Sequence, residues 1–342
     1  MQAVTGWDIG GAHLKVAQRD TQGRLIQVRQ IACPLWLGIE ELEKAVREAL
    51  PGLPRAPGSH HITMTGELAD SFNSRHQGVL AIASFMSRLL PEGEVLFYAG
   101  PAGLIPATEV ATHWSAIASA NWHASARYCG ILSRPALFMD IGSTTTDIIP
   151  VVGQPLNVGY TDAERMVSEE LVYSGVIRTP VMAVARRVPF RGEWQMLAAE
   201  HFATMADVYV LSGDLEADQI QADSADGGDA GEEGSAVRLA RMLGRDLETG
   251  DRSRMRSLAR YLARTQRQQW CASVERVLSR LPDFEDALFV GAGVGRFQVQ
   301  HLAAELGYDY IDFADVAKIT EPLRSQAAVC APAVALSLLD NI

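Results

Sequence analysis

Two short stretches of this chain combine an aspartate, a glycine turn and small or hydroxyl side chains in the same order. The first is WDIGGAHLK, residues 7–15, and the second is MDIGSTTTD, residues 139–147. In each, an apolar segment ends in Asp-Ile-Gly and an extended segment follows the turn. Glycine lets the backbone approach a ligand closely and direct its N–H groups outward, which suits phosphate oxygens. We therefore expect two phosphate-binding hairpins.

The charges around these turns suggest a metal ion. Asp8 and Asp140 end the strands that precede the turns, and Lys15 follows the first turn. A hydrated Mg²⁺ that also binds phosphate takes only one or two carboxylates. We expect Asp8 and Asp140 to hold Mg²⁺ and Lys15 to add positive charge. The residues expected to contact phosphate are Gly10, Gly11, Ala12, Gly142, Ser143, Thr144 and Thr145.

A third glycine turn lies late in the chain, in FVGAGVGR, residues 289–296. Arg296 stands where a dinucleotide-binding fingerprint needs its last glycine, and the chain has no G-x-x-x-x-G-K-[ST] motif. Neither a dinucleotide-binding motif nor a P-loop is therefore indicated. Gly291, Gly293 and Gly295 are candidates for binding a nucleotide or a substrate, and the sequence does not decide whether adenine binds there.

Several other polar side chains are candidates for substrate binding or proton transfer. Glu67, Asp147, His13 and Asp162 could each act as a base, and the sequence does not rank them. Glu67 could equally begin a helix, and Asp162 could lie in a helix cap. The candidates for nucleotide or substrate contact, besides the three glycines, are Asn121, Asp162, Arg165 and Arg178.

The hydrophobic pattern predicts an α/β protein. Strand, turn and strand open the chain and recur near residue 140, which is an internal repeat. An acidic, glycine-rich segment, residues 214–236, predicts a mobile surface loop. The expected helices are 39–50, 76–90, 107–127, 192–206, a pair within 237–279, 301–307 and 327–341. Further strands are expected at 61–68, 94–100 and 207–213, and in 286–297, where a buried strand breaks into the third glycine turn.

The composition excludes some partners. The chain has 342 residues with 30 basic and 41 acidic side chains, a net charge of −11, which opposes broad binding to nucleic acid or anionic membranes. No segment is apolar enough for a membrane span, and residues 1–11 lack a secretion signal. None of the four cysteines forms a C-x-x-C pair. We expect a cytoplasmic protein with small-molecule substrates, and a homo-oligomer is compatible with the sequence.

The three glycine turns together resemble those of the actin, heat-shock-70 and sugar kinase superfamily, in which they are two phosphate loops and an adenosine loop. More narrowly, the chain resembles hydantoinase/oxoprolinase-related proteins linked to tetrahydromethanopterin-dependent C1 transfer. His13 departs from the resemblance, because asparagine is expected there. The stretches that carry the narrower resemblance are WDIGGAHLK (7–15), TMTGELAD (63–70), SANW (119–122), DIGSTTTDIIP (140–150), TDAERM (161–166), LVYSGVIRTPVMA (171–183) and VGAGVGRF (290–297).

This resemblance implies two ribonuclease-H-like lobes with the site in the cleft between them. The first lobe is expected at 1–131 with 320–342, and the second at 132–319. The resemblance also implies a Mg²⁺-dependent transferase of methanofuran or methylofuran biosynthesis. Such an enzyme would join an aminomethyl-furan methyl diphosphate to a tyramine- or tyrosine-type phenol and release pyrophosphate. The alternatives are an ATP-dependent small-molecule kinase, a hydantoinase/oxoprolinase-like hydrolase, and a non-catalytic nucleotide-sensing protein.

Overall fold

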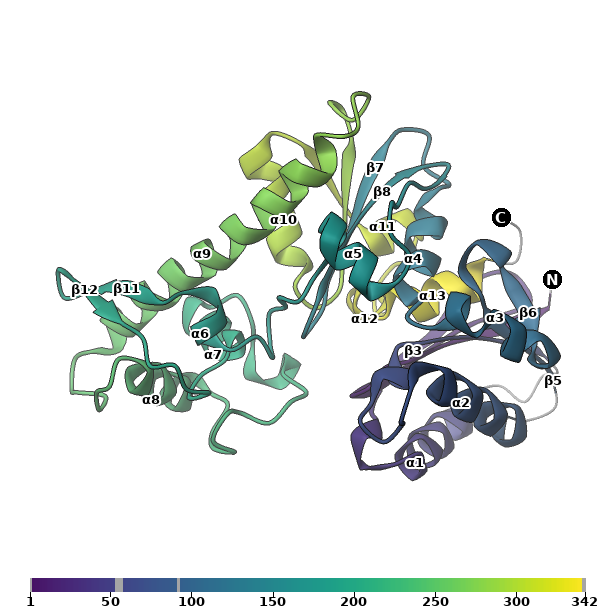
Figure 1. Cartoon of the computed structure of the whole chain (residues 1–342), viewed down its shortest axis with the longest axis horizontal. Coiled ribbons are helices and arrows are strands. Elements are labelled where there is room, and N and C mark those ends of the chain that lie inside the picture. Colours follow the sequence, from purple (N-terminus) through teal and green to yellow (C-terminus); the bar gives the residue numbers. More distant parts are fainter. Residues whose placement is uncertain (1, 53–57, 91–92, 340–342) are drawn as a thin grey trace. The chain divides into compact units, whose positions relative to one another are not determined.

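The computed structural model describes residues 2–52, 58–90 and 93–339, and the chain divides into two compact units (Figure 1). Unit 1 comprises Met1–Phe138, Ile149–Arg165 and Ile311–Ile342, and unit 2 comprises Met139–Ile148 and Met166–Tyr310. These units differ from the lobes expected from the sequence in residues 132–138, 149–165 and 311–319. No helix in the described part of the chain combines the length and apolarity needed to cross a membrane.

Unit 1 is built on a six-stranded sheet in the order β3-β2-β1-β4-β5-β6. The first three strands form an antiparallel meander, whereas β4 and β5 continue the sheet parallel to β1. The central strand β1 is buried along its whole length, which explains its apolar composition. The strands are β1 Ala3–Ile9, β2 His13–Arg19, β3 Leu25–Ala32, β4 Gly58–Met64, β5 Gly93–Tyr98 and β6 Leu104–Pro106.

The two faces of this sheet are covered by different helices (Figure 1). Trp7 and Ile9 of β1 point into a hydrophobic core that also contains residues of α1 and α2. Because neighbouring residues on a strand point to opposite faces, Gly6 and Asp8 lie on the other face, where α13 packs. A Cβ on Gly6 would lie 2.0 Å from the backbone oxygen of Ala333 in α13. Glycine at position 6 is therefore required for this helix to approach the sheet.

The helices of unit 1 agree well with those predicted from the sequence. The expected helix at 107–127 is broken at Ala118–Ala120, and the apolar C-terminal helix packs onto β1 as predicted. The helices are α1 Glu40–Ala49, α2 Arg75–Leu89, α3 Val110–Ile117, α4 Asn121–Cys129, α5 Asp162–Ser168, which ends in unit 2, α11 Phe313–Val316, α12 Arg324–Val329 and α13 Ala331–Leu338. The short 3₁₀ helices are η1 Leu35–Leu37, η2 Leu50–Gly52, η3 Gly66–Leu68, η4 Gly100–Ala102 and η5 Ala107–Glu109.

The second sheet has the order β10-β8-β7-β13-β14, with β9 paired to β8, and it contains the second Asp-Ile-Gly turn. The long helix α9, green in Figure 1, packs against α7 within unit 2. The strands are β7 Ala136–Ile141, β8 Thr146–Val152, β9 Gln154–Pro155, β10 Leu171–Val172, β13 Leu288–Ala292 and β14 Asp309–Asp312. The remaining elements are α6 Val181–Val184, β11 Arg187–Phe190, β12 Glu193–Met196, α7 Met205–Ser212, η6 Ala217–Gln219, α8 Glu232–Met242, α9 Arg252–Leu278 and α10 Arg296–Leu306.

The sequence prediction for residues 192–213 is wrong. The segment expected to be a helix contains the hairpin strand β12, and the segment expected to be a strand forms helix α7. Arg191 and Gly192 have φ values of 52° and 86°, which build a tight hairpin turn between β11 and β12. Helix α7 is buried on nearly all sides, so its apolar sequence lacks the one-sided pattern of a surface helix.

The acidic segment at 214–236 carries more structure than the sequence predicts. Helix α8 begins at Glu232, inside the expected loop. The buried guanidinium of Arg238 contacts Asp207 at 2.7 Å and Asp226 at 3.1 Å, and it donates to the backbone oxygen of Asp229 at 2.9 Å. Since two of these partners lie in the segment, it is tied to helix α8, and its mobility stays a prediction.

Candidate functional site

The two predicted glycine turns share one hydrogen bond that defines their shape. The Gly10 N–H donates to the His13 carbonyl at 2.9 Å, and the Gly142 N–H donates to the Thr145 carbonyl at 2.9 Å. Each turn therefore connects its two strands through the same four-residue geometry. The internal repeat inferred from the sequence is present in the backbone itself.

In the second turn, neighbouring backbone groups fix the direction of two N–H groups. The Gly142 carbonyl accepts from the Val176 N–H at 3.1 Å, and the Ser143 carbonyl accepts from the Arg178 N–H at 2.8 Å. In a trans peptide, the carbonyl and the following N–H point in opposite directions. The N–H groups of Ser143 and Thr144 therefore point away from residues 176–178. Two successive N–H groups directed to one side form an anion-binding concavity.

The first turn follows the same logic. The Gly11 carbonyl accepts from the Leu35 N–H at 3.0 Å, so the Ala12 N–H points away from residue 35. A Cβ on Gly11 would meet no described atom within 4 Å, whereas a Cβ on Gly10 would lie 3.0 Å from the His13 oxygen. The side of the turn at Gly11 is thus open to a ligand.

Asp8 and Lys15 lie together because they are direct cross-strand partners in β1 and β2. The Lys15 Nζ lies 3.6 Å from an Asp8 carboxylate oxygen. The Asp8 side chain is only 3% exposed and that of Lys15 is 24% exposed. The sequence placed both residues beside the first turn, and the structure confirms that they adjoin each other at its base.

Glu67 is a buried carboxylate beside this turn. It follows Thr65 and Gly66, and the Thr65 N–H donates to the Ile9 carbonyl at 2.9 Å. The Glu67 side chain is buried; its Oε1 accepts from the Ser119 hydroxyl at 2.9 Å, while its Oε2 has no hydrogen-bond partner among the described residues. Burial raises the pKa of Glu67 to about 7, despite the lowering effect of the Ser119 hydrogen bond.

Ser119 itself is held in a strained backbone conformation. Its φ is 52°, in the left-handed region that serine rarely adopts, at the break between α3 and α4. This conformation places the hydroxyl on Glu67. Strain of this kind gathers at functional sites, because the surrounding structure must hold it in place. The sequence analysis did not single out Ser119, since no residue pattern shows that a serine has a positive φ.

A second ion pair lies near Glu67. Asp162, at the start of α5, accepts from the Arg75 guanidinium at 2.6 Å. Asp162 is 7% exposed, and its charge acts on Glu67 in the direction that raises the pKa of that carboxyl, whereas Arg75 lowers it. The structure therefore brings two of the four candidate bases, Glu67 and Asp162, into one electrostatic group. Arg75 was missed by the sequence analysis.

Aromatic side chains complete this part of unit 1. The buried Arg165 guanidinium stacks over the Trp122 ring at 3.9 Å, and the Tyr160 ring lies 5.7 Å from Trp122. The Trp122 indole N–H has no hydrogen-bond partner in the described part of the chain. Asn121 begins α4, and its side-chain oxygen accepts from the backbone N–H of Trp122 at 2.8 Å. Arg165 and Asn121, predicted as substrate contacts, thus flank one aromatic group.

The third glycine turn packs against the second. A Cβ on Gly293 would lie 2.4 Å from an Asp140 carboxylate oxygen, and one on Gly291 would lie 2.7 Å from the Tyr310 ring. A Cβ on Gly295 would lie 2.5 Å from the Ile141 side chain, and the Gly295 N–H donates to the Ile141 carbonyl at 2.8 Å. Contacts inside unit 2 therefore favour glycine at all three positions, most strongly at Gly293, where φ is 82° and the backbone oxygen of Ile141 is close.

The carboxylates can be tested as magnesium ligands by their chemistry. No group of three or more His, Cys, Asp or Glu side chains suited to a metal lies within the described ranges. Mg²⁺ bound to a diphosphate needs fewer protein ligands than this, and hard carboxylate oxygens are the type it prefers. Asp8 and Asp140 each stand beside a phosphate-type turn and fit that role. Asp147 lies on β8 opposite Leu171 of β10.

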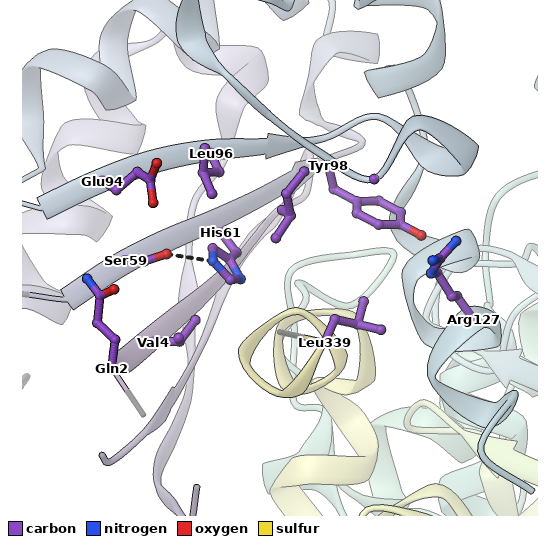
Figure 2. A pocket seen from close by; sticks show the side chains of 11 residues that line it. Gln2, Val4, Ser59, His61, Glu94, Leu96, Tyr98, Arg127 and Leu339 are labelled. Atoms are coloured by element: carbon purple, nitrogen blue, oxygen red, sulfur yellow. Dashed lines mark hydrogen bonds between the residues drawn. The ribbon is translucent and has the colours of Figure 1, made fainter. Parts of the chain in front are cut away.

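A pocket of about 330 Å³ lies on unit 1, and its wall contains Ser59 and His61 (Figure 2). The His61 Nδ1 must donate to the Leu336 carbonyl, at 2.9 Å, so the Ser59 hydroxyl donates to Nε2 at 2.6 Å. Burial lowers the pKa of His61 to about 4, which makes it a weak base. The pocket contains none of the predicted site residues. The hydrogen bond between Ser59 and His61 satisfies a buried histidine and has a structural role.

Comparison with known proteins defines the class. The model of the hydantoinase/oxoprolinase family matches residues 60–338, and the chain belongs to that family. A solved structure of acetone carboxylase without nucleotide aligns with a TM-score of 0.55 at 10% identity, covering 98% of this chain and 70% of that one, which is a likeness of fold. The expected α/β class is confirmed by the two sheets and the helices that accompany them.

Two curated relatives indicate the kind of enzyme more specifically than the family does. The chain is 25% identical over 98% of its length to a (4-(4-(2-(gamma-L-glutamylamino)ethyl)phenoxymethyl)furan-2-yl)methanamine synthase of Methanocaldococcus jannaschii, of which it covers 97%. It is 31% identical over 116 residues, 34% of this chain and 52% of the relative, to a synthase of the same name from Methanococcus vannielii. The chain is accordingly an enzyme, a biosynthetic condensing transferase.

Proposed function

We propose that the enzyme joins an aminomethyl-furan methyl diphosphate to the phenol of a tyramine- or tyrosine-type substrate, with release of pyrophosphate, in the synthesis of a methanofuran or methylofuran cofactor. The names of both relatives describe a product in which a phenol oxygen is bonded to a furan methyl carbon. Forming that ether requires removal of the phenol proton and departure of the diphosphate from the methyl carbon. The enzyme therefore needs a base for the phenol and hydrogen-bond donors for the diphosphate.

The observation that carries the proposal is the buried Glu67 carboxylate with one oxygen uncommitted among the described residues. A base whose pKa is about 7 accepts a proton from a phenol of pKa near 10 at a cost of about 4 kcal/mol. An ordinary glutamate, with a pKa near 4.5, would do so at about 7 to 8 kcal/mol. Burial therefore makes Glu67 a considerably better base for a phenol, and about half of the Glu67 carboxyls stay ionised at pH 7.

Each unit carries a turn whose donors suit the phosphate groups of the leaving diphosphate. In unit 2 the N–H groups of Ser143 and Thr144 point to one side of their turn, and in unit 1 the open side of Gly11 lies beside Lys15 and Asp8. Asp8 beside the first turn, or Asp140 beside the second, would bind a Mg²⁺ ion, which would neutralise part of the diphosphate charge. Backbone donors aimed at developing negative charge stabilise it without needing to reorganise.

The packing of the third glycine turn supports a diphosphate that belongs to the furan substrate. Gly291, Gly293 and Gly295 are explained by Tyr310, Asp140 and Ile141 without a nucleotide. In contrast, the space beside Gly11 is open. In this proposal the Asp-Ile-Gly turns bind the diphosphate, and the third glycine turn has a structural role.

The test is reconstitution with purified enzyme, the furan diphosphate, a phenolic amine or amino acid, and Mg²⁺. We expect release of pyrophosphate in equal amount to an ether product detected by mass spectrometry. Glu67→Gln should lower kcat by about 100-fold or more, the usual contribution of a general base, with little change in KM for the diphosphate. Transfer of the ATP γ-phosphoryl group to a small molecule would instead establish the kinase alternative, and ATP hydrolysis coupled to ring opening would establish the hydrolase alternative, if no ether forms.

A further inference from the structure

Residues 174–178 hold the second phosphate-type turn from behind. The N–H groups of Val176, Ile177 and Arg178 all donate to the carbonyls of residues 142 and 143, at 2.8 to 3.1 Å. Gly175 lies so close to the turn that a Cβ there would stand 2.5 Å from the Ser143 carbonyl carbon. The direction of the Ser143 and Thr144 N–H groups therefore depends on where this segment sits.

Buried side chains hold that segment: Thr146 and Trp270 donate to the Ser174 carbonyl at 2.7 and 3.3 Å, and Gln266 bonds to both Ser174 and Gly175. Gln266, in the middle of α9, has no exposed surface. Its Nε2 donates to the Ser174 hydroxyl at 2.9 Å and to the Gly175 carbonyl at 2.9 Å. Its Oε1 accepts from the Tyr209 hydroxyl of α7 at 2.7 Å. Gln266 thus links helices α7 and α9 to the two residues that precede the N–H donors.

The chemistry of the amide makes this link specific. The Gly175 carbonyl can only accept, so the NH₂ group must face it, and the Tyr209 hydroxyl then finds the amide oxygen. A glutamate at position 266 could still accept from Tyr209 but would turn a negative oxygen toward the Gly175 carbonyl. A methionine has a similar volume and can make neither bond. Only an amide meets both partners.

We propose that Gln266 is a positioning residue for the anion-binding turn at 142–145, acting through Ser174 and Gly175. The inference rests on the proposed function, in which that turn holds the diphosphate. With Gln266 in place, residues 176–178 keep the carbonyls of residues 142 and 143 turned inward. The N–H groups of Ser143 and Thr144 are then ready for the diphosphate before it binds, which removes the need to order them during the reaction.

The experiment compares Gln266→Met with Gln269→Met in the full-length enzyme. Gln269 lies on the same helix and donates to the Val184 carbonyl, away from residues 174–178. Pyrophosphate binding is measured by calorimetry, and KM is measured separately for the furan diphosphate and for the phenol. We expect Gln266→Met to weaken pyrophosphate binding and raise KM for the diphosphate by about tenfold, with KM for the phenol unchanged. Gln269→Met should match the wild type in all three.

Two further measurements separate failure of the positioning role from failure of the proposed function. If Gln266→Met does not fold, Tyr209→Phe removes a single hydroxyl from the same link, and it should weaken pyrophosphate binding by about threefold. Unchanged pyrophosphate affinity in a folded Gln266→Met or Tyr209→Phe enzyme that still forms the ether would overturn the positioning role alone. A wild-type enzyme that forms no ether and binds no pyrophosphate would overturn the proposed function and this inference together.

Discussion

Replacing Glu67 by glutamine should make the protein more stable and the enzyme much slower. Glutamine has the same shape and keeps an oxygen that can accept the Ser119 hydroxyl. It carries no charge, so the cost of holding a carboxylate in a buried position disappears. The expected gain depends on pH, because wild-type Glu67 is charged only above its own pKa.

The size of the gain follows from the two pKa values. Burial raises the pKa of Glu67 from 4.5 to about 7, so the folded protein binds this proton more tightly than the unfolded chain does. Wild-type stability therefore falls as pH rises from about 4.5 through about 7. The charged side chain costs the fold about 3 kcal/mol at pH 8 and about 1 kcal/mol at pH 5. Since glutamine avoids both costs, the variant gains most at high pH.

The assay is thermal unfolding of both proteins at pH 5 and pH 8, beside their condensation rates. In a chain of 342 residues, 1 kcal/mol corresponds to about 1 to 2 °C. We expect Glu67→Gln to raise Tm by about 4 °C at pH 8 and about 1 °C at pH 5. A gain that is equal at the two pH values, or a loss at pH 8, would refute the reasoning, because it would mean that the Glu67 carboxylate is not penalised by burial.

Four further substitutions test other parts of the structure. Gly6→Ala should destabilise the protein by about 3 kcal/mol or more, measured by urea unfolding, because its Cβ would meet the backbone of α13. Gly11→Ala should leave Tm nearly unchanged and weaken pyrophosphate binding severalfold in calorimetry. Gly293→Ala should lower Tm, because Gly293, unlike Gly11, combines a φ of 82° with close contacts. Ser119→Ala removes a hydrogen bond that lowers the pKa of Glu67, so the rise of kcat/KM with pH should move to higher pH.

The glycine turns could be predicted because their geometry is local. Asp-Ile-Gly and the residues after it define the hairpin within a few positions, and both turns have the expected closing hydrogen bond. The prediction exchanged helix and strand at 192–213 because no local pattern marks the true elements there. Helix α7 is buried on nearly all sides, so its apolar run of residues has no helical periodicity to reveal it, and the hairpin before it depends on the φ of Arg191.

The setting of Glu67 could be predicted only in part. The sequence named Glu67 and Asp162 as candidate bases but could not show that they share one electrostatic group. That group depends on Arg75 pairing with Asp162, 87 positions away, and on Ser119 reaching Glu67 from a position 52 residues distant. Contacts over such distances are set by the packing of α2, α4 and α5, which no local pattern in the sequence encodes.

Two unfavourable features of unit 1 meet at one carboxylate, and this bears on its role. Glu67 is buried with one uncommitted oxygen among the described residues, and Ser119, which donates to it, has a strained φ of 52°. Each feature costs about 1 to 3 kcal/mol, and either would be removed by a simple substitution. Both instead lie beside the first phosphate-type turn, where a base must stay desolvated to keep its pKa near neutral. A structural role would be served equally well by glutamine, and the comparison of Glu67→Gln in stability and in rate separates the two directly.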